Sequence, residues 1–475
     1  MTVAPAEPRP ATPPPATQRS STPLADEARR LPPAPTGLDA MAHLPGERGT
    51  PLVGHTLQFV RDARELVARM RDAHGATFRV SMFGFPVLVV GHPDHVKRAL
   101  MDPGKDFSSR LGWQHAIGEL FCDGLMLRDF DEHRLHRKLM QVAFRTEAMR
   151  TYLDRMNPLI ERGIARWSAT PELRFYPAIK QLTLDLAADV FLGMPLGAEA
   201  DRLNQAFVDS VQASIALIKK PVPPFSYWRG MRGRRLLEEF FARRIADRRD
   251  SDGADMFTQL CQATTDEGER FSDREIVDHM IFLLMAAHDT TTSSITTLIW
   301  SLAQHPEWQE RLREEHAGLG GGALAYDHKD RLPLTEQAFK EALRMYPPVP
   351  FIGRRTVREV ELDGLRLPKN AGVSVCSLVT HFLPELWSEP HRFDPDRFSP
   401  ERAEDRRHSH AYYPFGGGAH MCLGMHFAHL QVKAFLVQLL ARYRVHLAPG
   451  QRVEMVPIPI PKPRNGLPVR LEALA

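Results

Sequence analysis

Residues 415–424 read Phe415-Gly-Gly-Gly-Ala-His-Met-Cys-Leu-Gly424 and place one thiol, Cys422, on a glycine-rich stretch that predicts a loop. An apolar segment, 425–436, follows at once and predicts a helix. Backbone N–H groups and the positive end of a helix dipole both stabilise a thiolate. The stretch therefore predicts a cysteine held in its deprotonated, strongly electron-donating form.

Other interpretations of this loop exist. A phosphate cradle is disfavoured because no Gly-Lys-Ser/Thr follows the glycines. A zinc site could be built from His420, Cys422 and His426, but structural zinc takes four ligands and the chain has no Cys-x-x-Cys pair. A buried, inert cysteine is the ordinary state of an isolated Cys.

The complete pattern Phe-x-x-Gly-x-x-x-Cys-x-Gly resembles the haem-thiolate loop of the cytochrome P450 family, a signature with few chance matches. The resemblance covers about residues 44–475. It implies that Cys422 is the axial ligand of the iron in a haem b cofactor, and that Phe415 and Gly424 belong to the cofactor site. Such a ligand makes the iron electron-rich and favours O–O cleavage.

Two more segments resemble family motifs and occur in the family order. Glu341-Ala-Leu-Arg344 matches Glu-x-x-Arg, and its two charged residues share one helix face. The segment 393–398 resembles the later Arg-Phe element and contains Arg397. The resemblance implies a structural cluster of Glu341, Arg344 and Arg397 behind the haem loop; the alternative is a set of surface ion pairs of little worth.

One long helix is predicted between Ser272 and His305. Ser272-Asp-Arg-Glu275 matches a capping box at its start, and His305-Pro306 marks its end. A helix of about 30 residues is roughly 45 Å long, enough to cross a large domain. Residues 280–287 are apolar on every face and predict a buried segment.

Within this helix, Ala286-Ala-His-Asp-Thr-Thr-Thr292 resembles the family's Ala/Gly-Gly-x-Asp/Glu-Thr-Thr, with Ala287 at the usual glycine. The resemblance implies catalytic roles for Asp289, which passes protons from solvent, and Thr290, which steadies bound dioxygen. Back-bonding of Thr290 to the Ala286 carbonyl would bend the helix, and a purely structural threonine is the alternative.

The two propionates of a haem need cationic or hydrogen-bonding partners. The resemblance implies four: His133 and Arg137 from a His-x-x-x-Arg helix that carries Val142 and Phe144, Arg354 before a predicted strand, and His420 in the cysteine loop. Ordinary surface cations are the alternative.

Segments that flank the haem in the family supply the substrate-pocket candidates, which are nearly all apolar and favour a terpenoid, steroid or fatty-acid-like substrate. They are Phe282, Met285, Ala286, Phe351, Ile352 and Ile460. Plain core packing is the alternative for the Met and aromatic residues. Arg110 and Trp113 fall in an expected lid loop and are candidates for binding a carboxylate. Lid loops are expected near 105–125 and 200–225.

The predicted fold is mainly α with a smaller β region, as in the cytochrome P450 fold. Strands are expected at 77–90 and near 356–377 and 452–472, and helices at Leu66–Ala73, Leu236–Arg248 and Trp308–His316. The proline-rich start predicts a disordered tail, residues 1–40, before a haem domain, residues 41–475.

Net charge, hydropathy and cysteine content limit the expected partners and location of the protein. A net charge of +3 over 475 residues, without a basic stripe, argues against nucleic-acid binding. No run of 18 apolar residues and no signal-peptide pattern is present, so we expect no membrane span. Four scattered cysteines suit a reducing compartment, and we expect a soluble, bacterial-type, cytoplasmic enzyme.

The expected activity is that of a haem-thiolate monooxygenase, which inserts one atom of O2 into a hydrophobic small molecule. Electrons would come from NAD(P)H through a separate ferredoxin and ferredoxin reductase. A basic face of Arg134, Arg137, Lys138, Arg406 and Arg407 is the expected ferredoxin site. The alternatives are a peroxide-driven peroxygenase and a non-catalytic haem or ligand carrier.

Overall fold

The computed structural model describes residues 31, 35–167, 170, 172–214, 216, 219–320, 322–450 and 452–474. Most of the expected tail, residues 1–40, therefore lies outside the described residues. The described part of it is packed against the domain, since the Thr36 N–H donates to the Asn370 carbonyl at 3.0 Å and a short 3-10 helix begins at Leu38.

Most of the described chain is helical. The α-helices are α2 (Thr56–His74), α3 (Pro93–Met101), α4 (Ser109–Ile117), α5 (Phe130–Met140), α6 (Thr146–Trp167), α7 (Phe175–Val190), α8 (Ala198–Ser214), α9 (Ser226–Ala242), α10 (Ile245–Arg249), α11 (Met256–Gln262), α12 (Asp273–Gln304), α13 (Pro306–Ala317), α14 (Pro333–Met345), α15 (Ser377–Thr380) and α16 (Met425–Leu440). The 3-10 helices are η1 (Leu38–Met41), η2 (Leu125–Leu127), η3 (Gln141–Phe144), η4 (Tyr326–His328), η5 (Pro395–Phe398), η6 (Glu404–Arg406) and η7 (Gly418–His420).

The strands are shorter and form small sheets. They are β1 (Thr77–Met82), β2 (Phe85–Val90), β3 (Phe107–Ser108), β4 (Leu173–Arg174), β5 (Phe351–Thr356), β6 (Val360–Leu362), β7 (Leu365–Leu367), β8 (Gly372–Cys376), β9 (Tyr443–Leu447), β10 (Met455–Val456), β11 (Lys462–Pro463) and β12 (Pro468–Ala473). The prediction of a mainly helical protein with a smaller β region is confirmed.

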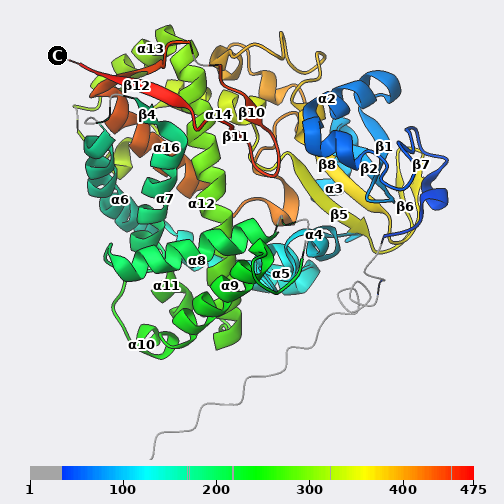
Figure 1. The fold of residues 1–475 in the computed structure, drawn as a ribbon, viewed down its shortest axis with the longest axis horizontal. Coiled ribbons are helices and arrows are strands. Elements are labelled where there is room, and N and C mark those ends of the chain that lie inside the picture. The colour runs from blue at the N-terminus through cyan, green and yellow to red at the C-terminus, as the bar shows by residue number, and fades with distance from the viewer. Residues whose placement is uncertain are drawn as a thin grey trace, which may run out of the picture.

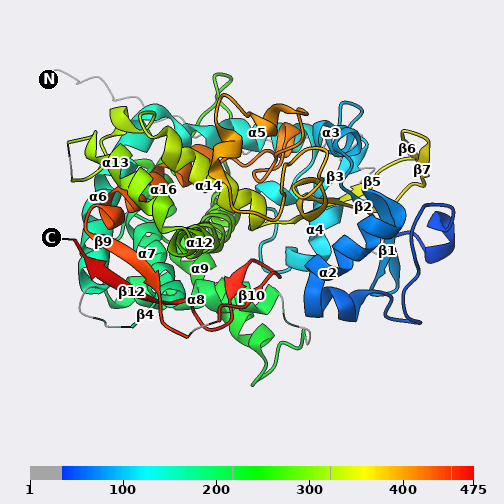
Figure 2. The same cartoon turned by 90° about the horizontal axis from the view of Figure 1, so that it is seen from above.

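The helices form a body at one end of the molecule, and the largest sheet lies at the other end (Figure 1). The long helix α12 passes through the middle of the body, and Figure 2 looks almost along its axis. Ser272 caps its start and exchanges both capping-box hydrogen bonds with Glu275, as the sequence predicted. No helix among the described residues is both long and apolar enough to span a membrane.

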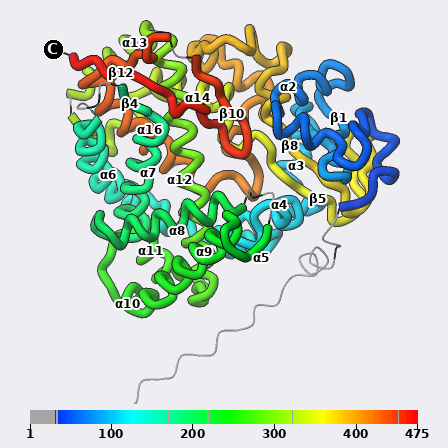
Figure 3. The backbone as a smooth tube through the Cα atoms, in the orientation of Figure 1, coloured from blue at the N-terminus to red at the C-terminus, as the bar shows by residue number. Residues whose placement is uncertain are grey.

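The largest sheet has the strand order β1-β2-β8-β5-β3. Strands β2 and β8 pair in parallel, and the other pairs are antiparallel. Segments from the N-terminal part of the chain and from near residue 370 thus lie side by side, as the blue and yellow tubes of Figure 3 show. This pairing fixes β5, which carries three of the predicted site residues, from Phe351 to Arg354.

Local predictions differ from the structure in three places. The expected helix 236–248 is broken between α9 and α10, at Arg243 and Arg244. The helix of His133 ends at Met140, so Val142 and Phe144 lie in the 3-10 turn η3. The expected lid loops contain helices, because α4 covers 109–117 of 105–125 and α8 covers 200–214 of 200–225.

Candidate active site

The cysteine loop owes its shape to its glycines. Gly416 and Gly418 have positive φ angles of 72° and 61°, which only glycine adopts freely. A Cβ atom on Gly418 would also lie 2.0 Å from the Leu100 carbonyl oxygen of α3. The loop closes on itself through the Cys422 N–H, which donates to the Phe415 carbonyl at 2.8 Å.

Cys422 is accessible although protein atoms surround it. Its side chain is exposed, yet burial is the largest influence on its pKa and raises it, while the Gly424 N–H and the Arg137 charge act to lower it. Arg137 is held beside the loop because its Nη1 donates to the Met421 carbonyl at 2.6 Å. A metal ion at the sulfur would deprotonate it outright.

The middle of α12 changes from fully buried to partly exposed residues. Residues 276–284 are buried, whereas Met285, Ala286, Ala287 and Thr290 are partly exposed. The first three and the loop residue Phe415 lie at the rim of the same apolar cluster. The Thr290 hydroxyl donates to the Ala286 carbonyl at 2.6 Å, as predicted, which leaves its oxygen lone pairs able to accept.

Asp289 is buried next to two basic groups. Its Oδ1 lies 3.4 Å from Lys180 Nζ of α7 and 3.1 Å from His288 Nδ1. Burial raises the pKa of Asp289, but the nearby His288 and Lys180 outweigh burial and hold it below its usual value. The side chain is thus a carboxylate with a proton donor beside it. The sequence did not reveal Lys180, which comes from a distant helix.

Three of the predicted propionate partners lie in one cluster. The rings of His133 and His420 lie with centroids 3.8 Å apart and planes tilted by 36°. Burial, followed by the charges of Arg137 and Arg354, lowers the pKa of His133 to about 3. The positive charge of the cluster therefore comes from the two arginines. Buried cations cost free energy unless they are paired, so the two carboxylates of a haem fit this cluster.

The Arg354 side chain is oriented by residues that the sequence did not reveal. Its Nη1 donates to the Gly353 carbonyl at 2.8 Å and contacts Ser109 Oγ at 3.4 Å. Burial lowers its pKa to about 10, and the buried Asp129 is the largest opposing charge. Asp129 accepts from the Ser109 N–H at 2.7 Å. Only the three-dimensional fold brings the segments of Ser109 and Asp129 to β5.

Glu341, Arg344 and Arg397 are fully buried and in direct contact. The Arg344 Nε donates to one Glu341 oxygen at 2.7 Å, and the Arg397 Nε donates to the other at 3.1 Å. A fourth member, Glu404 of η6, accepts from Arg397 Nη1 at 2.9 Å. The sequence did not reveal Glu404, which lies outside any family motif quoted above. Surface ion pairs are excluded for this cluster.

The predicted pocket residues lie in three segments: α12, β5 and the turn between β10 and β11. Phe282 packs on Gly124, where a Cβ would lie 2.5 Å away. Ile352 lies against the cysteine loop, 3.8 Å from the Cβ position of Gly416, and the Phe351 ring packs on Phe59. Ile460 is partly exposed in the turn between β10 and β11.

Arg110, a candidate for binding a carboxylate, has other partners. Arg110 forms an ion pair with Asp123 at 2.9 Å and donates to the Leu127 carbonyl at 3.0 Å, so its charge is already compensated. Among the described residues, no group of three or more His, Cys, Asp or Glu side chains is placed to hold a metal ion. This arrangement argues against zinc at His420, Cys422 and His426.

Together, the helical body, the sulfur-bearing loop before α16 and the long central helix define a haem-thiolate protein. The family model for cytochrome P450 matches residues 44–468. The chain belongs to the cytochrome P450 family.

Its relatives cover most of its length. Cytochrome P450 136 of Mycobacterium tuberculosis is 40% identical over 93% of this chain and 90% of its own. Human cytochrome P450 26B1 is 30% identical over 90% of this chain and 86% of its own. A solved structure described as retinoic acid bound cyanobacterial CYP120A1 superposes with a TM-score of 0.83 at 29% identity, covering 91% of this chain and 99% of that one.

Membership of the family establishes the reaction class and the cofactor. The protein is a monooxygenase that uses O2, a substrate and a redox partner. It carries a haem iron with a cysteine thiolate ligand.

Replacing Glu341 tests the buried charge cluster. We expect Glu341→Gln to lower the free energy of unfolding by about 3–5 kcal/mol, because two buried guanidinium groups lose their shared carboxylate. Urea denaturation, followed by tryptophan fluorescence and haem absorption, measures the change. The matched control is Glu389→Gln, whose exposed pair with Arg392 contributes less than about 1 kcal/mol. Equal midpoints for the two variants would contradict the role of the cluster.

Proposed function

We propose that this monooxygenase oxidises a hydrophobic small molecule at a haem b whose iron is held by Cys422. One observation carries the assignment of the residue: Cys422 is exposed at the end of the glycine loop, where the Gly424 N–H and Arg137 favour its thiolate against the effect of burial. Phe415 and Gly424 shape this loop.

When bound, the haem supplies the activation of O2. The propionates would be held by Arg354, His133, His420 and Arg137, and Arg137 also donates to the Met421 carbonyl of the loop and favours the thiolate. Asp289 moves a proton toward the oxygen-binding side. The Thr290 oxygen accepts a hydrogen bond from a water that carries this proton, because its own hydroxyl proton is donated to Ala286. Glu341, Arg344 and Arg397 support the loop structurally.

Replacing the sulfur tests the ligand. We expect Cys422→Ser to abolish the long-wavelength absorption band of the reduced, carbon monoxide-bound protein, because a neutral hydroxyl donates far less charge than a thiolate. Cys122→Ser is the control, since its thiol donates to the carbonyls of Gly118 at 2.9 Å and Glu119 at 3.5 Å. A variant at position 422 that keeps the band and the oxidation would overturn the assignment.

Replacing Thr290 tests the proton relay. We expect Thr290→Ala to release hydrogen peroxide in place of oxidised substrate. Product per NAD(P)H should fall about tenfold, which is less than the roughly hundredfold minimum effect of a general acid or base. Ser294→Ala is the matched control, because its hydroxyl only bonds back to the Thr290 carbonyl at 2.8 Å. Product and peroxide are both quantified against NAD(P)H consumed; unchanged coupling would contradict the relay.

The same measurements separate the two alternative functions. A peroxygenase would turn over with hydrogen peroxide alone at least as fast as with ferredoxin, reductase and NAD(P)H, and would not need the relay. A non-catalytic carrier would bind haem and ligand without product under either condition. The buried Asp289 beside Lys180 and His288 favours reductant-driven chemistry.

The substrate class follows from the pocket walls and the relatives. Met285, Ala286, Phe351, Ile352 and Ile460 are partly exposed and apolar, and buried apolar surface favours apolar ligands. The solved relative is described as retinoic acid bound. We therefore propose a terpenoid, steroid or fatty-acid-like substrate, with isoprenoid acids first.

A spectral titration tests the substrate class. Retinoic acid, a long-chain fatty acid and a steroid are each added to the ferric protein, and displacement of water from the iron is followed by absorption. We expect saturable shifts with at least one of the three, because the walls are apolar. A nucleoside of similar size is the control. A shift with the nucleoside alone would contradict a hydrophobic substrate.

The proposed electron donor is an acidic ferredoxin, supplied by its reductase, that docks on the cysteine side. Arg137 links this side to the cysteine loop through Met421, which is 37% exposed. Arg134, Lys138, Arg406 and Arg407 are exposed. Several of their charges are shared with local carboxylates, such as that of Lys138 with Glu267 at 3.0 Å.

Ionic strength tests this docking. We expect reduction by ferredoxin to slow as salt rises, because salt screens complementary charge. Arg406→Glu should slow reduction at low salt, whereas Arg61→Glu on α2 should not. Stopped-flow reduction under carbon monoxide measures the rates. Reduction rates that change neither with salt nor in Arg406→Glu would contradict docking of the ferredoxin on this surface.

The haem domain is proposed to span residues 41–475, which includes the matched range 44–468, with residues 1–40 as a separate tail. A cytoplasmic location is proposed as well, because all four cysteines are free and such thiols suit a reducing compartment.

A further inference from the structure

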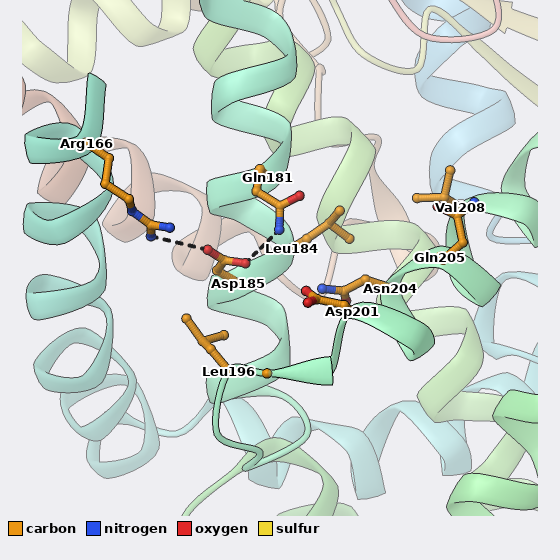
Figure 4. Close-up of a pocket in the computed structure, with 10 residues that line it drawn as sticks. Arg166, Gln181, Leu184, Asp185, Leu196, Asp201, Asn204, Gln205 and Val208 are labelled. Atoms are coloured by element: carbon orange, nitrogen blue, oxygen red, sulfur yellow. Dashed lines mark hydrogen bonds and ion pairs between the residues drawn. The ribbon is translucent and has the colours of Figure 1, made fainter. Parts of the chain in front are cut away.

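A polar hollow of about 670 Å³ lies on the surface beside α6, α7 and α8. Figure 4 shows Arg166 of α6 and Gln181 of α7 pointing toward Asp185, which lies at its centre. Gln181 donates to Asp185 at 2.9 Å. Asn204 and Gln205 of α8 line the hollow as well. The hollow is open to solvent, so water and protons reach Asn204 from outside.

A second, much smaller cavity of about 10 Å³ lies deeper. It shares Leu184 and Asn204 with the hollow, and its inner wall includes His288 of α12. A volume of this size is about that needed for one water molecule, provided that polar groups hold it. The two cavities are thus neighbours, and the inner one borders the helix that carries Asp289.

Polar atoms are available at both ends of the inner cavity. The Asn204 Nδ2 is buried and has no hydrogen-bond partner among the described residues. The His288 Nδ1 likewise has no well-aligned partner in the described part of the chain. An unsatisfied buried polar atom costs free energy, and one bridging water would satisfy both atoms.

The His288 ring must share a proton with Asp289. Its Nε2 lies 3.3 Å from the Lys180 carbonyl, which can only accept, so Nε2 carries a proton. Its Nδ1 lies 3.1 Å from Asp289 Oδ1. Two bare acceptors at this distance repel, so a second proton lies on one of them. Lys180 Nζ lies 3.4 Å from the same oxygen and favours the carboxylate, so the proton is assigned to the histidine.

We propose that His288 is a positioning residue that stores the proton for Asp289 and is refilled from the hollow past Asn204. In the delivery step the N–H bond at Nδ1 breaks and an O–H bond forms on Asp289. In the refilling step a water in the inner cavity gives a proton to Nδ1 and takes one from solvent. The inference rests on the proposed role of Asp289 and Thr290.

Among the described residues, few groups face the pair of His288 and Asp289. Helix α7 contributes Lys180, whose Nζ is 3.4 Å from Asp289, and Tyr176, whose pKa the Asp289 charge helps to raise. Helix α8 contributes the Phe207 ring, edge-on to the His288 ring at 5.5 Å. Lys180 supports the carboxylate, and the aromatic edge is uncharged.

Three variants separate the route from general damage. His288→Gln keeps a polar side chain but cannot store a proton, and Asn204→Leu blocks the path at nearly the same volume. Gln205→Leu is the matched control, because Gln205 lines only the outer hollow and its amide already donates to Asp209 at 3.0 Å. Thermal midpoints and the carbon monoxide spectrum confirm that each variant folds and binds haem.

The first measurement is coupling and its solvent isotope effect. We expect His288→Gln and Asn204→Leu to lower product per NAD(P)H by about fivefold, less than the roughly hundredfold minimum for a directly placed acid, and to raise the isotope effect in deuterium oxide. Gln205→Leu should match the unmodified protein. Coupling in His288→Gln equal to the unmodified protein would overturn the inference, as would equal losses in Asn204→Leu and Gln205→Leu.

The second measurement needs no turnover. In the diamagnetic, carbon monoxide-bound protein with 15N-labelled histidine, the resonance lost in His288→Gln identifies this ring. We expect protons on both of its nitrogens, and loss of the Nδ1 proton in Asp289→Asn. A ring with a bare Nδ1 in the unmodified protein would overturn the proposal. If the unmodified protein instead lacks the thiolate band or any product, the proposed function itself fails.

Discussion

The Cys422 sulfur must be open to iron and yet shielded from water, and the rest of the site follows from this double requirement. A loop can present a sulfur in this way only if its backbone turns tightly, which the left-handed Gly416 and Gly418 permit. The loop also lies directly on Leu100, with no room for a side chain at Gly418. Stabilisation of the thiolate then falls to the Gly424 N–H and Arg137.

A sulfur fixed in this manner requires a rigid support. The support is electrostatic: Glu341, Arg344 and Arg397 are all fully buried, and Glu404 compensates the second guanidinium. Buried ion networks add little stability over an apolar core, but they tolerate few alternative arrangements because each unpaired charge is costly. The network therefore specifies the position of the segments behind the loop more than it stabilises the fold.

The sequence alone predicts those parts of the site that depend on residues close together in the chain. The thiol loop, the Ser272 cap and the Thr290 back-bond depend on neighbours within a few residues, and the structure shows the cap and the back-bond as predicted. It could not give Lys180, Asp129 or Glu404, because each reaches its partner through packing of distant segments. The expected lid at 105–125 contains α4 for a related reason: Gly112 of α4 packs on Gly353 of β5, and this tertiary contact outweighs weak local propensity.

The two sides of the haem site differ in how charge is balanced. On the side of Arg354, His133 and His420, burial and the nearby arginine charges keep the two histidines neutral. The buried Arg354 faces Asp129, and its guanidinium and the ring N–H groups suit a bound dianionic cofactor. At Asp289, by contrast, one carboxylate faces two basic groups that are already in place. A proton can pass between the histidine and the carboxylate at small cost because the total charge of the pair does not change. The first arrangement suits the binding of a cofactor, and the second suits the proposed transfer of a proton.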